Sequence, residues 1–269
     1  MDDPRHRPSF VRVGTSLARE ADAAVREARA DIDPATTRFV LAFIPMGLDL
    51  DDMLGALNTH LDGLPVFGCT TAGQITGNGY ESEALLLLAF QKANFRCAST
   101  LFKPLNPLRI TEISAQAKRL SDGFVHTAGW NRMCLVFTDG LSKQEDLLIS
   151  ALNLALDDLP LFGGSAGDGL EFMETFVLQE KAFHRDAALL LMLETNLGFQ
   201  GLGFDHFLPA ETQVVITQAD PSERMVFEIN GAPAAQEYAR LVGCSEKDLS
   251  PLVFAENPML VEHLSLIHI

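Results

Sequence analysis

The sequence has little basic charge and no long apolar run, and each shortage excludes a class of protein. It holds 20 Lys and Arg against 36 Asp and Glu, a net charge of −16, so it lacks the cationic surface that nucleic acids and anionic membranes require. The longest apolar runs, 84–90 and 187–193, have seven residues each, whereas a membrane-spanning helix needs about 20. The N-terminal MDDPRHRPSF also lacks the apolar core of a signal peptide.

Cysteine is scarce as well. The four cysteines, Cys69, Cys97, Cys134 and Cys244, are scattered along the chain, and no two have the spacing of a zinc cluster or a CxxC redox pair. Scattered thiols suit a reducing compartment. We therefore expect a cytoplasmic protein of bacterial type.

What the chain does have is a repeat. ALNTHLDGLPVFG at 56–68 and ALNLALDDLPLFG at 151–163 lie 95 residues apart (151 − 56) and agree at nine of thirteen positions. A short apolar segment of buried-strand type precedes each copy, FVLAF at 39–43 and CLVFT at 134–138. Chance similarity between two leucine-rich helices is the alternative, but it does not explain why the proline of LPVFG and LPLFG is copied in register.

Each half is expected to run strand, helix, strand and glycine turn, because residues at helical spacing separate two apolar runs. Such a unit favours parallel pairing of its two strands. After the turn, SEALLLLAF at 82–90 matches RDAALLLML at 185–193, an offset of 103 (185 − 82). The second half therefore carries eight extra residues in its turn region (103 − 95).

These patterns predict an α/β fold in which duplicated strand–helix–strand units form a layered architecture with mixed sheets. The repeat halves are expected at about 39–110 and 134–203, within a first domain covering 12–219. Residues 220–269 are expected to be the start of a second α/β domain that is cut short.

The two glycine turns hold the candidate ligand-binding residues, which are Cys69, Thr70, Gly164, Ser165 and Asp168. Side chains that follow strands are where α/β folds place ligand groups, and glycine turns offer backbone N–H groups to an anion or a carboxylate. The bland alternatives are a small buried cysteine at a strand end, an Asp-Gly turn and a tight turn that needs small residues.

Gly163–Gly167 also matches G-x-S-x-G, the nucleophile elbow of α/β-hydrolases, with Ser165 as the nucleophile. That motif needs a helix directly after it, whereas LEFMETFVLQE alternates more like a strand. A Ser165 or Cys69 hydrolase is therefore the third hypothesis, after the two ligand-sensing hypotheses described below.

The glycine turns GCTTAG and FGGSAGDG together resemble the FIST family of intracellular sensory proteins. VVITQADPSERMVFEINGAPAAQEYARLVG at 214–243 is similar to the opening of that family's C-terminal domain. The resemblance covers about residues 12–255. It implies a bacterial signal-input protein that regulates a partner histidine kinase or cyclic-di-GMP enzyme, and one branch of the family binds haem and senses nitric oxide.

We therefore expect a sensor without catalysis, with haem and nitric oxide as the preferred ligands and a small amino-acid-like metabolite as the alternative. A sensor haem needs an axial ligand, most often a histidine. His206 is the candidate, since Phe204 and Phe207 flank it just before the second domain, where an aromatic junction would suit a flat cofactor. A packed or solvent-facing histidine beside two core phenylalanines is the alternative, and His184 is the next candidate ligand.

Overall fold

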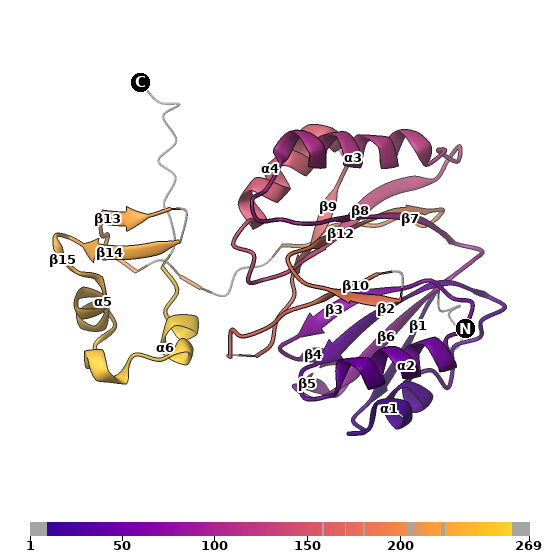
Figure 1. The fold of residues 1–269 in the computed structure, drawn as a ribbon, viewed down its shortest axis with the longest axis horizontal. Coiled ribbons are helices and arrows are strands. Elements are labelled where there is room, and N and C mark those ends of the chain that lie inside the picture. Colours follow the sequence, from indigo (N-terminus) through magenta and orange to yellow (C-terminus); the bar gives the residue numbers. More distant parts are fainter. Residues whose placement is uncertain are drawn as a thin grey trace, which may run out of the picture. The chain divides into compact units, whose positions relative to one another are not determined.

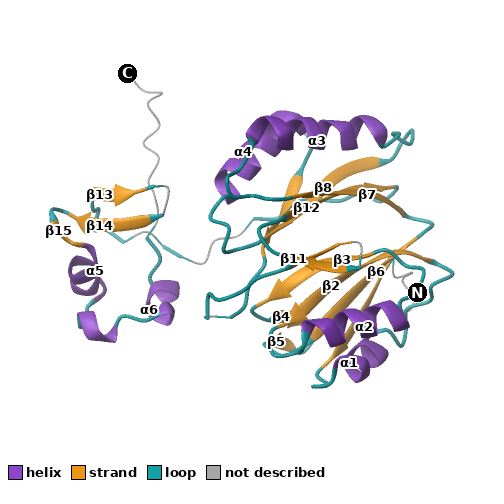
Figure 2. Cartoon of the chain, in the orientation of Figure 1, coloured by secondary structure: helices purple, strands orange, loops and turns teal. Residues whose placement is uncertain are grey.

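A computed structural model describes residues 10–157, 159–169, 171–179, 181–203, 207–208, 210–221 and 224–259. The chain divides into two compact units, Met1–Phe199 (unit 1) and Gln200–Ile269 (unit 2). Each unit is described by itself. The mixed sheets and covering helices confirm the predicted layered α/β class (Figure 2).

Unit 1 contains the same series of elements twice. The first copy comprises β1 (Val11–Ser16), α1 (Ala21–Ala28), β2 (Thr37–Pro45), α2 (Leu50–His60), β3 (Val66–Thr71), β4 (Gln74–Thr76), β5 (Gly79–Glu81) and β6 (Leu85–Gln91). The second comprises β7 (Phe95–Phe102), α3 (Ile110–Gly123), β8 (Asn131–Thr138), α4 (Glu145–Leu156), β9 (Leu161–Ser165), β10 (Val177–Gln179), β11 (Ala182–His184) and β12 (Ala188–Thr195). The repeat thus includes a strand and a helix before each predicted half, and β7, expected in the first half, opens the second.

Two sheets form the centre of unit 1, and their strand orders match. The first sheet is β1-β6-β2-β3-β10-β11, and the second is β7-β12-β8-β9. Apolar side chains from both sheets, such as Phe39, Leu41, Phe137 and Leu191, form one shared core. Helices α1 and α2 pack on the outer face of the first sheet, and α3 and α4 on that of the second, so the unit has four layers (Figure 1).

The predicted parallel pairing is confirmed in both copies, with one correction to the register. Val40 lies opposite Val66 in β2–β3, and Cys134 lies opposite Leu161 in β8–β9. Strand β8 therefore matches β2 at an offset of 94 (134 − 40), although β9 matches β3 at 95 (161 − 66). A one-residue slip would turn every side chain to the other face, and only the offset of 94 lets both Val40 and Cys134 face the helices. The second copy has absorbed one extra residue in the loop before α4.

The hairpins β4–β5 and β10–β11 match at an offset of 103 (177 − 74) but pair differently. β10 crosses to the first sheet and pairs antiparallel with β3, whereas β4–β5 stays a separate two-stranded sheet. Two residues, 72–73, join β3 to β4, and eleven, 166–176, join β9 to β10. The second connection is nine residues longer (11 − 2), of which eight are the insertion expected from the sequence and one arises because β9 ends a residue earlier than β3 (165 against 71 + 95 = 166).

Unit 2 is a small α/β assembly. Its three-stranded sheet contains β13 (Ile216–Asp220), β14 (Met225–Ile229) and β15 (Ala232–Pro233), and its helices are α5 (Ala234–Val242), the 3₁₀ turn η2 (Glu246–Asp248) and α6 (Pro251–Glu256). Gly243 ends α5 in the left-handed conformation, which glycine adopts readily at the end of a helix. Tyr238 stacks on Phe254, which ties α5 to α6.

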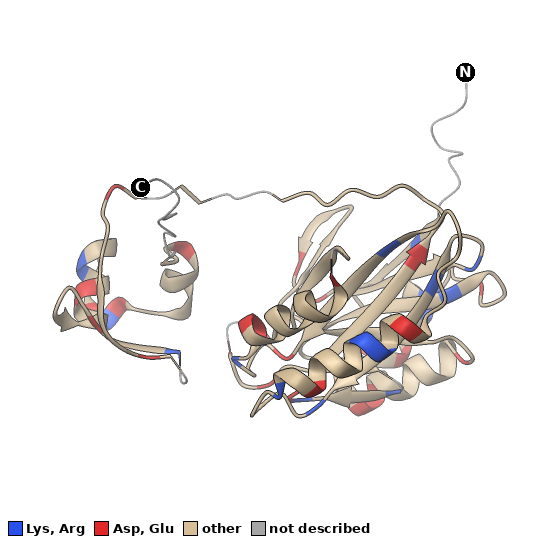
Figure 3. Ribbon diagram, turned by 90° about the horizontal axis from the view of Figure 1, so that it is seen from above, with Lys and Arg blue, Asp and Glu red and all other residues tan. Residues whose placement is uncertain are grey.

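Lys and Arg lie singly over unit 1 among Asp and Glu, without gathering on one element (Figure 3). Within the part of the chain that the structure describes, no helix has the length and apolar character needed to cross a membrane.

Candidate functional site

The two glycine turns predicted as ligand-binding segments meet at one end of the two sheets of unit 1. The N–H of Ala166 donates to the carbonyl of Thr138 at 2.7 Å, and the next N–H, of Gly167, donates to the carbonyl of Thr70 at 3.0 Å. The chain therefore passes from the second sheet to the first within two residues. Gly167 allows this, because a Cβ there would lie 3.2 Å from the backbone nitrogen of Ala72.

Gly68 and Gly163 hold equivalent places in β3 and β9. Their φ angles are +152° and +151°, and a Cβ on either would lie 1.8 Å from a carbonyl oxygen, of Ala42 in the first copy and Val136 in the second. Only glycine tolerates this backbone and this approach. The sequence alternative of a tight turn that needs small residues thus holds at Gly68 and Gly163, whereas a Cβ on Gly164 would have no heavy atom within 4 Å.

Cys69 and Thr70 are buried and have a structural role. Burial raises the pKa of the Cys69 thiol to about 12, so it carries almost no thiolate at neutral pH and is a poor nucleophile. The Thr70 side chain is fully buried, and its Oγ1 accepts from the Phe176 N–H at 3.0 Å. Both residues help to hold β3 against the incoming second copy.

Asp168 organises the connection between β9 and β10. Its carboxylate accepts backbone N–H bonds from Phe172, Met173 and Glu174 at 3.1, 2.6 and 3.0 Å. Burial opposes ionisation, but the three bonds outweigh it and lower the pKa of Asp168. Its hydrogen-bonding capacity is thus largely used within the chain.

Asp139, which follows β8, also accepts hydrogen bonds from backbone N–H groups. Its carboxylate accepts from the N–H of Asp186 at 2.6 Å, from the N–H of Leu141 at 3.0 Å and from the Thr175 hydroxyl. It ties the start of β12 to the loop after β8.

Gly164 and Ser165 are the predicted ligand-binding residues that lie exposed. Ser165 Oγ is 3.5 Å from Glu145 Oε1, at the start of α4. In the described residues between β9 and β10 no helix follows Ser165, so the local structure differs from a nucleophile elbow.

His206 and Phe204, on which the haem hypothesis depends, lie outside the described residues. Phe207 belongs to unit 2 and is half-buried. In the described ranges, no group of three or more His, Cys, Asp or Glu residues is placed to hold a metal ion.

A polar cleft lies where β10–β11 passes the edge strand β7 of the other sheet. Its volume is about 350 Å³, and its walls are Ser99, Thr100, Leu101, Gln179, Ala182 and His184. Gln179 Nε2 donates to Ser99 Oγ at 3.0 Å and so links the two sheets across the cleft. No sequence motif identifies these residues, because they come from strands more than 70 residues apart in sequence (179 − 101 = 78). The signal in the sequence was the eight-residue insertion, which lets the β10–β11 hairpin cross to the first sheet.

His184 is half-buried in this cleft. Its Nε2 lies 3.3 Å from the carbonyl of Gln179. A carbonyl only accepts, so Nε2 carries the proton in the neutral ring and Nδ1 is an acceptor. No wall residue is Asp, Glu, Lys or Arg, so the cleft suits a small ligand held by hydrogen bonds.

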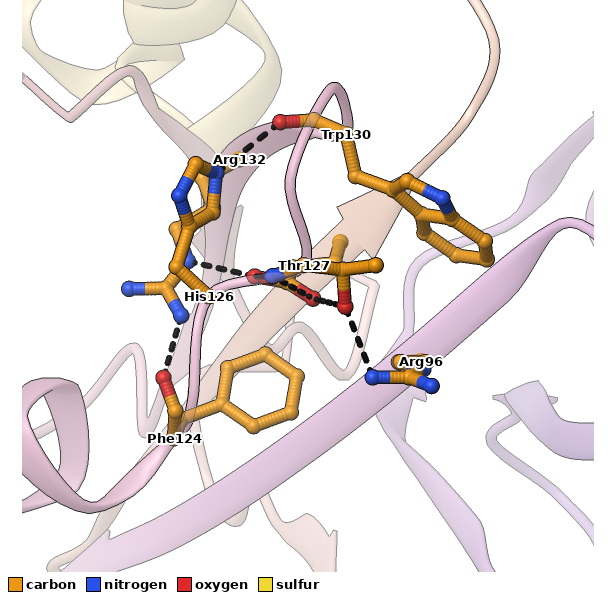
Figure 4. A network of polar contacts seen from close by, with 7 residues as sticks. Arg96, Phe124, His126, Thr127, Trp130 and Arg132 are labelled. Carbon is orange, nitrogen blue, oxygen red and sulfur yellow. Dashed lines mark hydrogen bonds and ion pairs between the residues drawn. The ribbon is translucent and has the colours of Figure 1, made fainter.

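A buried ion pair at the far end of β8 and β12 is a second polar cluster (Figure 4). Arg132 Nε donates to Glu194 Oε1 at 2.8 Å, and the Thr127 N–H and hydroxyl donate to the same carboxylate. Burial disfavours the charged form of Glu194, but these bonds and the Arg132 charge outweigh it and lower its pKa. Arg132 also donates to the carbonyl of Phe124, and Arg96 donates to the Thr127 hydroxyl. The cluster thus fixes the loop between α3 and β8.

Comparison with known proteins gives one family. A model of the FIST N domain matches residues 38–232. No curated protein matches the chain. Among solved structures, cyanuric acid hydrolase from A. caulinodans is similar over 70% of this chain and 72% of its own, at 10% identity and a TM-score of 0.34, a likeness too low to support an argument about function.

Proposed function

The chain belongs to the FIST N domain family, a family of small-ligand sensory domains, and we propose that it senses a small polar metabolite in the cleft between β7 and β10–β11. The observation that carries this proposal is the cleft itself, which has hydrogen-bonding walls from both sheets and a volume of about 350 Å³. Ligand pockets in proteins begin near that size. An amino acid or a similar small molecule fits the volume and the neutral walls.

The cleft also supports a route from ligand to signal. Its walls come from β7, an edge strand of the second sheet, and from the β10–β11 hairpin that ends the first sheet. A ligand held by Ser99 and His184 would fix the two sheets against each other at this edge. A ligand shifts a protein between two conformations only when it binds one of them better than the other. A ligand that contacts both sheets meets this condition where the two conformations differ in the spacing of the sheets. The output we propose is regulation of a histidine kinase or cyclic-di-GMP enzyme, without catalysis by this chain.

Calorimetric titration of the full chain with free amino acids and their amides tests the site. We expect saturable binding that falls at least about tenfold in His184→Ala and in Ser99→Ala. His126→Ala is the matched control, because His126 also contacts a backbone carbonyl, that of Trp130 at 3.0 Å, but lies outside the cleft. Equal loss in the control, or no binding of any of these compounds, would refute the proposal.

Haem with nitric oxide is a separate proposal and needs a different site. The cleft walls carry hydroxyl, amide and imidazole groups, whereas a haem needs broad apolar walls, so the described cleft does not fit it. His206 with Phe204 and Phe207 stays the predicted haem site. Reconstitution with haem should give a Soret band that changes in His206→Ala, and a protein that stays colourless would remove this hypothesis.

A further inference from the structure

The pairing of β10 with β3 shows how a hairpin of this repeat covers a sheet edge. Val177 lies opposite Cys69 and Leu178 opposite Gly68, antiparallel. Leu178 is 1% exposed and enters the core under α2, against residues such as Leu54, Leu64 and Val66.

The equivalent hairpin of the first copy, β4–β5, leaves its matching side chains in solvent. Ile75 corresponds to Leu178 and Tyr80 to Phe183 at the offset of 103, and they are 85% and 69% exposed. Phe183 instead packs against the core under α2. The first hairpin has the length and the apolar side chains of the second, but it covers no sheet.

The short connection explains this. The connection from β3 to β4 has two residues, 72–73, whereas eleven residues lead from β9 to β10. The hairpin is held instead beside its own strand, because Gln74 Nε2 donates to the carbonyl of Phe43 at 3.3 Å and the Tyr80 hydroxyl to that of Ala72 at 3.0 Å.

The strand that corresponds to β3 is β9. Among the described residues of unit 1, β9 pairs on one side, with β8, and its residues 162–165 are exposed, with the ring of Phe162 in edge contact with that of Phe199. Ile149, Leu159 and Leu161 pack against the core beneath α4 and correspond to Leu54, Leu64 and Val66 at the offset of 95. Leu159 is half-buried whereas Leu64 is buried, and the other two pairs are half-buried in both copies. The apolar side chains that surround Leu178 in the first copy are thus repeated beside β9 in the second.

We propose that β9 receives the β4–β5 hairpin of a second copy of this chain. Transferring the β10–β3 register by the two offsets places Ile75 opposite Gly163 and Gln74 opposite Gly164, antiparallel. Addition of a strand to an open edge is a recurrent mode of recognition. Reciprocal exchange about a two-fold axis uses both hairpins and both edges, and so closes at a dimer.

Sedimentation of the full chain tests the assembly. We expect a concentration-dependent dimer whose dissociation constant rises at least about tenfold in Ile75→Glu. The control is Val13→Glu, which places the same charge on an exposed residue of β1 (61% exposed). Circular dichroism confirms folding of both variants. A monomer at all concentrations, or a dimer that Ile75→Glu leaves intact, would overturn the proposal.

A crosslink tests the register. In a Cys244→Ser background, Thr76→Cys in one copy should lie opposite Phe162→Cys in the other, since the inferred pairs sum to 238 (75 + 163). Mixing the two single variants under mild oxidation should give a covalent dimer of the pair. A mixture of Val13→Cys with Phe162→Cys should not. Equal crosslinking in the two mixtures would refute this register and the hairpin as the occupant of β9.

Discussion

Replacing Gly163 by alanine should destabilise unit 1 strongly. The backbone there has φ of +151°, and the new Cβ would lie 1.8 Å from the carbonyl oxygen of Val136, in the neighbouring strand of the parallel pair. A non-glycine residue in such a conformation costs about 1–3 kcal/mol, and relief of the overlap must open the β8–β9 ladder. We therefore expect a loss of at least about 3 kcal/mol, near 6–12 °C in melting temperature for a unit of this size.

Gly164→Ala is the matched control, one residue along the same strand. A Cβ there meets no heavy atom within 4 Å, so its effect should stay within about 0.5 kcal/mol. Gly68→Ala should repeat the Gly163 result in the first copy, since the approach to Ala42 is the same. Differential scanning calorimetry of the three variants measures this. If Gly163→Ala melted with the unchanged protein, or if Gly164→Ala fell as far, the steric argument would be wrong.

Three further predictions concern buried polar groups. The pKa of Glu194 is lowered from 4.5, so its carboxylate stabilises the fold above about pH 4.5, and this contribution is lost as pH falls through the lower pKa of the folded state. Denaturant titrations at a series of pH values measure it. The free energy of unfolding should fall less steeply with decreasing pH in Glu194→Gln than in the exposed control Glu112→Gln. Burial raises the pKa of Cys69 to about 12 and of Cys134 to about 11, so neither thiol should react with a disulfide reagent at pH 8 until the protein is denatured; fast labelling in the native state would contradict this. Asp168→Ala leaves three N–H groups without their acceptor and should cost about 1–3 kcal/mol, with proteolysis appearing first near Met173; an unchanged melting temperature would show that another acceptor replaces the carboxylate.

The sequence predicted the duplication and its parallel units because apolar spacing and the LPVFG and LPLFG segments are local signals. The need for small residues in the glycine turns was also visible in the sequence, and the structure shows it at Gly68 and Gly163 but not at Gly164. The one-residue register difference was missed, because the extra residue lies in a loop where nothing in the pattern marks it.

The cleft and the buried ion pair were beyond sequence reasoning. Ser99 and His184 approach only because a hairpin leaves one sheet for the other, and nothing local shows that destination. Arg132 and Glu194 are 62 residues apart and become partners through the pairing of β8 with β12. Most of the predicted ligand-binding residues instead form hydrogen bonds or packing contacts that hold the two copies together.

The crossing of β10 also bears on how unit 1 acquires its fold. The two copies are joined by residues 92–94, but each depends on the other. The second copy supplies β10, the strand beside β3 of the first, and β3 supplies the strand pairing that holds β10. Nucleation confined to one copy would therefore leave an unsatisfied edge, and we expect folding to be cooperative across the duplication. For the same reason, two fragments produced by dividing the chain within residues 92–94 should associate when mixed, because β10 of the second fragment pairs with β3 of the first.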